Sequence, residues 1–531
     1  MPSEIILVLQ FTFLFIVLFI VHAFKVDSWS NRFLSFLINV RSSTIINNRL
    51  KRHQLIPFSL TLGNIRVDGS LSIPTCPYRF PDGQGSTAKF CDGESASRNW
   101  ADRYGPIYRI WSGFTPEVVL TRAEDVKVAY RDSSRHRKAP DLNSGWLLGD
   151  LMGQGVGFLS QDDWKRVHQV VAMPFAQKPI TYLPFILPRV ERSFDDLTMR
   201  YGESSPKGDL HLKPADDLQL LPFMIISDIL YGELPAPLEE ELLSITKLRN
   251  EIWKYSFKGG LFLFAFGKLF YPSLRKKVQL FHKRWAEFND QAYYHARTSE
   301  APVPITSLYS AVHCGQLSKA NLLHSLDEAL FANIDVTIGS FSWNPLFLAA
   351  NPEVQEELRA EISEARSQHV HSSNAWHSYL SSNSTLLAAC INESGRLRPI
   401  ATHTYPQTLP TDRTIGGYLI PKGTCMIVDN NALNVRDPSW GADGELYRPK
   451  RFLGTPVGAF RYHLWRYGFG PRQCMAQHVA EMILRVLVAY TIEHYRVKFP
   501  MEKVSKERHW KKPKPDQWFS VAEKTILCET I

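Results

Sequence analysis

The stretch YGFGPRQCMA, from Tyr467 to Ala476, places one cysteine between a turn-rich run and an apolar helical pattern. Glycines, a proline and Arg472 precede Cys474, and no second cysteine lies nearby. The pattern that follows, 475–495, has its polar residues on one stripe, which is typical of a helix buried against a large core. We expect the helix dipole and nearby backbone N–H groups to favour the thiolate form of this cysteine.

Three interpretations of Cys474 are open at this point. An isolated cysteine is most often a buried structural residue, and a catalytic nucleophile would need a histidine partner that the sequence does not place. The third interpretation is a ligand of a flat, bulky group, because the glycines let the backbone approach it and Arg472 can pair with an anion at its rim. The neighbouring motifs favour this third interpretation.

The stretch resembles the haem-ligand signature of the cytochromes P-450, F-x-x-G-x-R-x-C-x-G, in which Gly470, Arg472 and Cys474 match. Tyr467 replaces the first phenylalanine and Ala476 the last glycine. The resemblance implies that the Cys474 thiolate is the axial ligand of haem b iron, where its electron donation favours O–O cleavage. It also implies that Gly470, Arg472 and Tyr467 belong to the cofactor-binding site.

Two further segments resemble motifs of that family, in the same order. ESGR, Glu393 to Arg396, resembles E-x-x-R, and YRPKRF, Tyr447 to Phe452, resembles F-x-P-E-R-F with Arg451 as its arginine. Residues three apart share one face of a helix, so a single carboxylate can accept hydrogen bonds from Arg396 and Arg451. An isolated E-x-x-R is more often a surface ion pair, but the resemblance implies a structural role for Glu393 and both arginines.

The segment DDWKRVH, which ends at His168, resembles the W-x-x-x-R helix that holds the haem propionates. Trp164 matches, whereas His168 stands where arginine is usual; a propionate would raise its pKa and favour the cation. The preceding GQGVGF, Gly153 to Phe158, resembles a nucleotide-binding glycine loop, but no strand–loop–helix unit or downstream acid accompanies it. We interpret it as the loop that enters the helix.

The segment FANIDVTIGS, which starts at Phe331, resembles the distal-helix motif A/G-G-x-D/E-T-T/S. Asp335 matches, Asn333 replaces glycine, and Val336 occupies the position of the usual proton-relay threonine. The resemblance makes Asp335 and Thr337 the candidate catalytic residues. Thr337 lies about 100° further round the helix than Val336, so an ordered water or a group on the substrate is an alternative relay.

The resemblance spans residues 61–531 and implies one haem domain with the cytochrome P-450 fold, mainly α with a smaller β part. That fold is a triangular prism with haem between a distal I-type and a proximal L-type helix. The implied reaction is monooxygenation of a lipophilic small molecule, with electrons from NADPH through a cytochrome P-450 reductase and cytochrome b5 as a second candidate donor. The chain resembles fungal enzymes that tailor natural products. A haem-binding sensor or carrier, and a haem-thiolate isomerase or dehydratase, stay open as alternatives.

The N-terminus predicts a membrane anchor. Ile5 to Phe24 is a run of 20 residues without Asp, Glu, Lys or Arg, which as a helix covers about 30 Å. A cleaved signal peptide is the rival interpretation, but the run lacks a basic start and a clear cleavage site. Basic residues follow the run, so the remainder should face the cytosol. We expect a transmembrane anchor at 1–26, a basic linker at 27–60 and a single-pass protein of the endoplasmic reticulum membrane.

Composition and surface patterns suggest the partners. The formal net charge is +9 without a nucleic-acid-binding motif, and the seven cysteines include no C-x-x-C pair, which argues against nucleic acid, a disulfide framework or a zinc cluster. Phe33 to Ile38 and Gly259 to Pro272 are apolar enough to enter the membrane interface, although the second segment fits a core equally well. The predicted reductase contacts are Lys165, Arg166, Arg461 and Arg466.

Overall fold

The computed structural model describes residues 16–17, 19–24, 28–42, 73–201, 209–256, 258–298, 303–371, 374–455, 458–500, 513 and 519–531. Most of the predicted anchor at Ile5–Phe24 and more than half of the predicted linker at 27–60 lie outside these residues. Within the described ranges no helix combines the length and the apolar character needed to cross a bilayer. The predicted transmembrane helix is therefore not found in the part of the chain that the structure describes.

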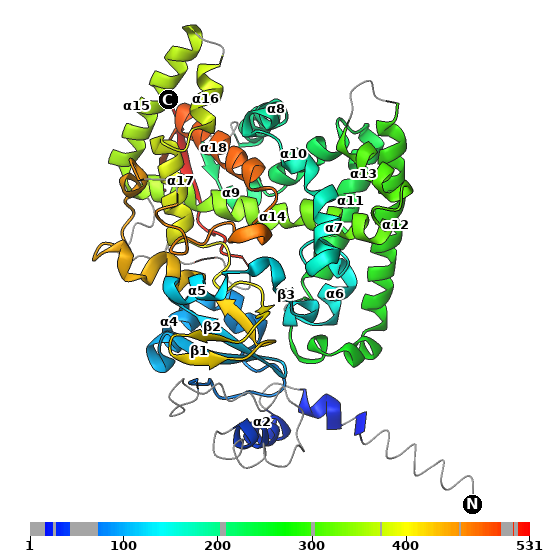
Figure 1. Ribbon diagram of the computed structural model, residues 1–531. Coiled ribbons are helices and arrows are strands. Elements are labelled where there is room, and N and C mark those ends of the chain that lie inside the picture. The colour runs from blue at the N-terminus through cyan, green and yellow to red at the C-terminus, as the bar shows by residue number, and fades with distance from the viewer. Residues whose placement is uncertain are drawn as a thin grey trace, which may run out of the picture.

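Helices form most of the described chain, as the sequence predicts, and Figure 1 shows α14 crossing the middle of the molecule. The helices are α2 (Trp29–Ser42), α4 (Gly93–Tyr104), α5 (Ala123–Ala129), α6 (Trp146–Met152), α7 (Gln161–Val171), α8 (Leu183–Tyr201), α9 (Pro214–Asp217), α10 (Leu221–Tyr231), α11 (Ala236–Trp253), α12 (Pro272–Ala296), α13 (Pro304–His313), α14 (Lys319–Ala350), α15 (Pro352–His371), α16 (Ala375–Ser381), α17 (Leu386–Leu397) and α18 (Gln477–His494). The helical segment 319–371 is divided into α14 and α15, because Asn351 leaves helical geometry (φ −133°, ψ 72°) before Pro352.

Within the described ranges, the strands form three small sheets. The largest has the order β1 (Ile107–Ser112), β2 (Thr115–Leu120), β8 (Cys425–Val428), β5 (Gln407–Thr408) and β3 (Arg137–Lys138). The others are β4 (Leu210–Leu212), β10 (Ile526–Thr530) and β9 (Tyr495–Lys498), and the pair β6 (Arg413–Ile415) and β7 (Tyr418–Ile420). Strand β1 pairs antiparallel with β2 in the register Ile107 to Leu120, and every residue of β1 is buried, so this sheet has cover on both faces.

Helices α14 and α18 form the centre of the core. Leu330 and Ile334 of α14 and Ile483 and Leu487 of α18 are at most 1% exposed. Helix α14 packs against α10 on one side and α18 on another. Because both central helices are enclosed by other helices, any exposed residue in the middle of α14 must face a space inside the molecule.

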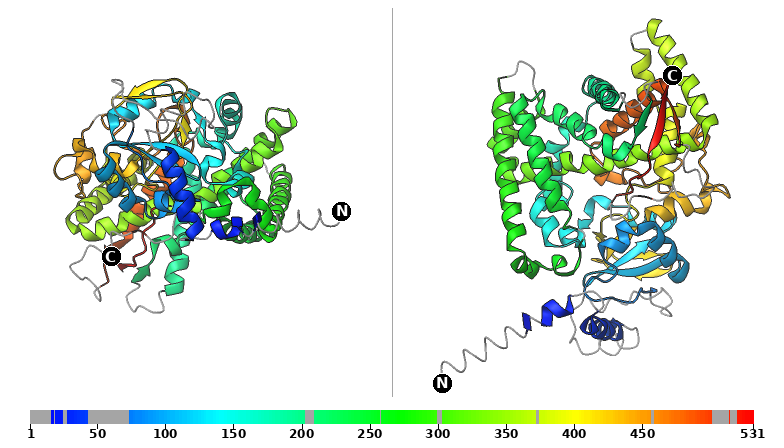
Figure 2. Two further views of the ribbon diagram at one scale, coloured as in Figure 1. Left: turned by 90° about the horizontal axis from the view of Figure 1, so that it is seen from below. Right: turned by 180° about the vertical axis from the view of Figure 1, so that it is seen from behind.

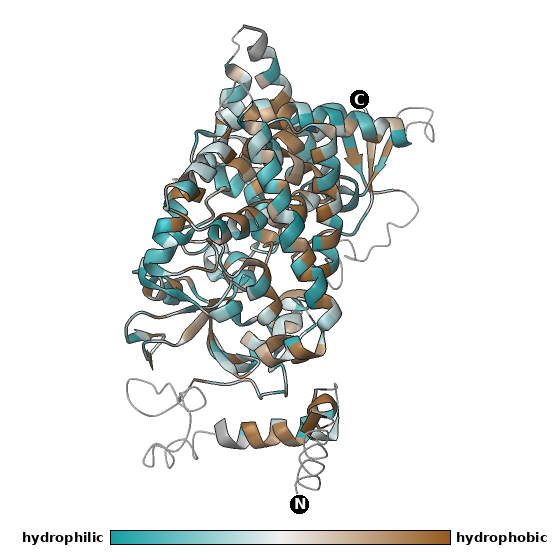
Figure 3. Ribbon diagram, turned by 90° about the vertical axis from the view of Figure 1, so that its right-hand side faces the viewer, coloured by the Kyte–Doolittle hydropathy of each residue, from teal (hydrophilic) through white to brown (hydrophobic). Residues whose placement is uncertain are grey.

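Helix α2 lies below the β1–β2 sheet, apart from the main body (Figure 2). Its polar side holds it to the chain that leads into the sheet: Asn39 and Tyr78 exchange two hydrogen bonds of 2.9 and 2.6 Å, and the Phe80 N–H donates to Ser35 at 2.7 Å. The other side is apolar, and Figure 3 shows hydrophobic residues along the helix. The exposed apolar residues of α2 are Trp29, Phe33, Phe36 and Leu37.

Candidate functional site

Cys474 lies in a turn just before α18. A short 3-10 turn, Gly470–Arg472, precedes it, and the backbone at Gly470 is left-handed with φ 70°. A Cβ at Gly470 would lie 2.6 Å from the Ser133 hydroxyl, so glycine is required for this close approach. The Cys474 N–H donates to the Tyr467 carbonyl at 2.8 Å and closes the turn.

The Cys474 side chain faces a recess within the protein. Cys474 is exposed to the recess, but protein surrounds its thiol. This burial has the largest effect on the pKa of the thiol and raises it. The Ala476 N–H lowers the pKa by a smaller effect, and the charge of Glu328 on α14 raises it further. The expectation that the helix start favours the thiolate is therefore wrong for the protein alone. A bound metal ion would deprotonate a coordinating thiol outright.

The middle of α14 forms the opposite wall of this recess. Ala332 is exposed although α14 crosses the interior (Figure 1). Glu328, Asp335 and Val336 lie on the same helical face and are partly exposed. Since the charge of Glu328 also acts on Cys474, this open face of α14 and the cysteine border one space.

The two predicted catalytic residues do not share a face of α14. Asp335 lies on the open face, whereas Thr337 is 3% exposed. The Thr337 hydroxyl donates to the Asn333 side-chain oxygen at 2.7 Å instead of entering the recess. Of the two, only Asp335 is placed beside the open space, next to the apolar Val336.

Trp164, His168 and Arg472 meet at the edge of the recess. The ring centroids of Trp164 and His168 are 4.8 Å apart, and the Arg472 guanidinium carbon lies 4.7 Å from the Trp164 ring. Burial lowers the pKa of His168, and the charge of Arg472 lowers it further, which favours the neutral imidazole. Burial also lowers the pKa of Arg472 to about 10. The structure thus brings together residues that the sequence placed in two separate motifs.

Lys138 and Glu328 belong to the same edge and were absent from the prediction. Burial, followed by the charge of Arg472, lowers the pKa of Lys138 to about 7, and the charge of Glu328 opposes this shift. Glu328 accepts a hydrogen bond of 2.8 Å from the Gly157 N–H, and a Cβ at Gly157 would overlap the carboxylate. The sequence feature that could have pointed to Glu328 is the glycine run Gly153–Phe158, because Gly157 leaves room for the Glu328 carboxylate.

These residues fit a haem group. Among the described residues, neither Arg472 nor Lys138 has a carboxylate within ion-pair distance, although both are only partly exposed and the charge of Glu328 acts on both. A metal-binding thiol, a helix that faces it and two unpaired cations at the edge are the groups needed for a flat ring with a central metal and two carboxylates. Cys474 would hold the iron, and Arg472 and Lys138 would hold the propionates.

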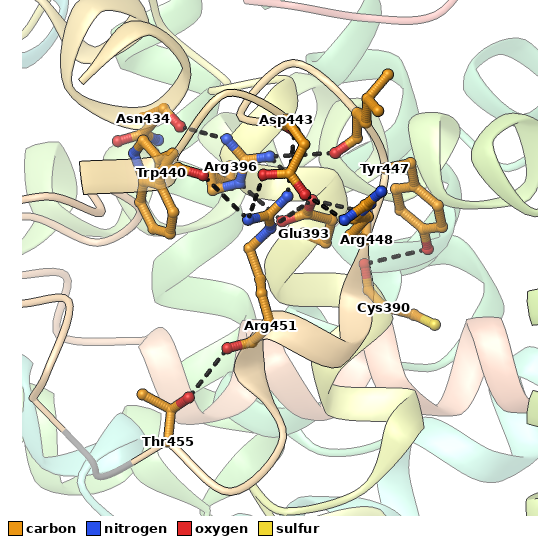
Figure 4. A network of polar contacts seen from close by, with 11 residues as sticks. Cys390, Glu393, Arg396, Asn434, Trp440, Asp443, Tyr447, Arg448, Arg451 and Thr455 are labelled. Carbon is orange, nitrogen blue, oxygen red and sulfur yellow. Dashed lines mark hydrogen bonds and ion pairs between the residues drawn. The ribbon is translucent and has the colours of Figure 1, made fainter. Parts of the chain in front are cut away.

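A buried ion-pair network is centred on Glu393 (Figure 4). The Glu393 carboxylate accepts bonds of 2.7 and 2.8 Å from Arg396 and one of 3.0 Å from Arg451, so the predicted pairing is present. Arg396 also donates to the Asn434 carbonyl at 2.8 Å. The Asn434 side chain in turn exchanges bonds of 2.9 and 2.7 Å with the backbone of Trp465. The network therefore reaches the chain just before the turn.

Arg466 cross-links two helices behind the turn. It contacts Glu481 of α18 at 2.6 Å and Asn392 of α17 at 2.5 Å, and it is only 12% exposed. The prediction that Arg466 contacts a reductase is therefore wrong, because its charge is used inside the protein. Burial raises the pKa of the neighbouring Tyr467 well above its ordinary value. The other predicted contacts are exposed: Lys165, Arg166 and Arg461.

The chain resembles known proteins over most of its length. The family model for cytochrome P450 matches residues 92–520. Cytochrome P450 monooxygenase roqR of Penicillium rubens is 45% identical over 100% of both chains. Cytochrome P450 monooxygenase aclC of Aspergillus oryzae is 40% identical over 87% of this chain and 93% of its own. A solved zebrafish cytochrome P450 with progesterone has the same fold, with a TM-score of 0.64 at 18% identity over 82% of this chain and 99% of its own.

Proposed function

We propose, on the premise that the chain belongs to the cytochrome P450 family, that Cys474 is the axial ligand of its haem. Members of the family are haem-thiolate enzymes, and this chain is a monooxygenase that receives electrons from a redox partner. The observation that supports Cys474 is its place opposite the open face of α14, beside Arg472 and Lys138, for which the described part of the chain shows no ion pair. The relatives are named monooxygenases, so the isomerase, dehydratase and carrier alternatives are not favoured.

The chain's own residues would hold the cofactor and arrange the protons. Haem with a thiolate ligand supplies O2 activation and oxygen insertion when it is bound. Arg472 and Lys138 would each pair with a propionate, which would raise their pKa values towards the ordinary range. Trp164 packs against Arg472 and limits its movement. Asp335, on the open face of α14, would be the acid that holds a proton on the distal side.

We infer a lipophilic substrate from fungal secondary metabolism. The relatives come from Penicillium and Aspergillus, which supports this class of pathway. The apolar segment Gly259–Pro272 has two parts: Phe262 is 4% exposed and stacks on Tyr271 at 4.3 Å, whereas Leu269 is 74% exposed. One part is thus core and the other faces outward, which suits an apolar entrance.

We also propose attachment to the endoplasmic reticulum membrane, with the catalytic domain in the cytosol. The apolar side of α2 points away from the protein, while the polar side is held at residues 78 and 80. Phe24, which precedes α2 in the chain, packs against the segment Gly259–Pro272, since its ring centroid lies 5.4 Å from that of Phe264. A membrane-bound NADPH-cytochrome P450 reductase would then meet the exposed Lys165, Arg166 and Arg461.

The test uses the full chain co-expressed with such a reductase in microsomes. The reduced protein with carbon monoxide should show the absorption band of thiolate-ligated haem. Cys474→Ser should abolish the band, and Cys314→Ser, at an exposed position, is the matched control. Incubation with candidate metabolites should give NADPH-dependent products that gain one oxygen atom. A Cys474→Ser protein that keeps the band would contradict the assignment.

A further inference from the structure

The Asn333 carboxamide is held in one orientation by two bonds within α14. Its nitrogen donates to the Ala329 carbonyl one turn earlier, and its oxygen accepts from the Thr337 hydroxyl at 2.7 Å one turn later. A backbone carbonyl can only accept, so the nitrogen must face Ala329 and the oxygen is left for Thr337. The chemistry of the partners therefore fixes which end of the carboxamide is which.

The remaining N–H group belongs to a residue that borders the recess. A carboxamide has two N–H donors, and the bond to Ala329 uses one of them. Asn333 is partly exposed and directly follows the exposed Ala332, whereas Thr337 is 3% exposed. The proton of Thr337 is already committed to Asn333, so Thr337 is poorly placed to donate to a molecule in the recess.

We infer that Asn333 is a hydrogen-bond donor of the distal pocket and that Thr337 is a positioning residue that holds it. This inference rests on the proposed function, because the acceptor is the outer atom of a diatomic ligand on the haem. Val336 occupies the position where a hydroxyl donor is expected and offers none. In this chain the Asn333 side chain would therefore supply the hydrogen-bond donor that Val336 lacks. The motif usually has glycine at the position of Asn333.

Carbon monoxide on the reduced, full-length holoprotein is the probe. A hydrogen bond to its oxygen lowers the C–O stretching frequency, which infrared spectroscopy measures without substrate or turnover. Asn333→Leu should shift the band to higher frequency. Thr337→Val should let the carboxamide turn, so that a second band grows at the Asn333→Leu position and the ratio of the two bands changes roughly 2- to 12-fold, the equivalent of one net hydrogen bond. Thr337→Ser keeps the hydroxyl and should restore the wild-type band.

Thr491→Val is the matched control, because Thr491 is also a buried helical threonine that bonds one turn back, to the Leu487 carbonyl at 2.7 Å. It should leave the band unchanged. An Asn333→Leu band at the wild-type frequency overturns the inference, and a shift confined to Thr337→Val would identify Thr337 as the donor instead. These results differ from failure of the proposed function, in which the wild-type protein shows no thiolate-type carbon monoxide band at all. Asn333→Gly serves as a second variant if leucine prevents folding.

Discussion

Glu393→Gln should destabilise the protein by about 3–5 kcal/mol, the usual cost of removing one partner from a buried ion pair. Glu393 and Arg396 are 0% exposed and Arg451 is 14% exposed, so water cannot replace the lost charge. The carboxylate accepts two bonds from Arg396, one from Arg451 and one of 2.9 Å from the Arg448 N–H. Glutamine keeps the volume and one acceptor oxygen, so the loss reflects charge and hydrogen bonding rather than a cavity.

A second pair with the same geometry provides the comparison. Arg366 and Glu493 form a fork with bonds of 2.7 and 2.8 Å, but their side chains are 36% and 24% exposed. Solvent screens this pair, and Glu493→Gln should cost under about 1 kcal/mol. The measurement is the free energy of unfolding in urea for holoproteins of equal haem content, followed by far-UV circular dichroism. Equal losses in the two variants would refute the reasoning that burial sets the cost.

Three further outcomes are expected. Haem affinity should fall as the pH rises above about 7, because Lys138, whose pKa is about 7 without a propionate partner, must then take up a proton before it can pair. Lys138→Arg should flatten this pH dependence in haem-transfer measurements across pH 6–9. If the Lys138→Arg protein keeps the pH dependence, another group is responsible for it. Asp335→Asn should lower turnover by roughly 10²–10⁴-fold, and Thr337→Ala should lower it less; the measurement is product formed per NADPH consumed. If the Asp335→Asn protein stays fully coupled, Asp335 is not part of the proton path. Phe36→Asp, at an exposed position of α2, should reduce binding to lipid vesicles about tenfold or more in flotation assays. The control Tyr294→Asp, at an exposed aromatic position of α12, should leave vesicle binding unchanged. Equal effects of the two substitutions would show that α2 is not the membrane-binding face.

The sequence predicted the parts of this molecule that local patterns encode. The helical majority and the Glu393 pairing follow from periodicity, from the i,i+3 spacing and from the family resemblance. The break at Asn351 was not predicted, although it is encoded locally, since Pro352 disfavours helical geometry in the residue before it. These features depend on neighbours in the chain, and so they are visible without a structure.

The rest depends on contacts between distant segments. Lys138 reaches the recess through strand β3 and carries no motif of its own, and Glu328 became significant only once Gly157 was found against it. The thiolate expectation for Cys474 failed because burial, which a sequence does not report, outweighs the backbone N–H. Arg466 was predicted to contact a reductase because the sequence does not show that it pairs with Glu481 inside the protein.

The dispersed origin of the recess has a consequence for how the enzyme is made. Its walls come from residues 138–168, 328–336 and 466–481, so the first and last contributions are separated by most of the coding sequence. A chain emerging from the ribosome holds no complete site until translation has passed Glu481, which anchors Arg466 behind the cysteine turn. The site can therefore take up haem only after most of the chain has been synthesised.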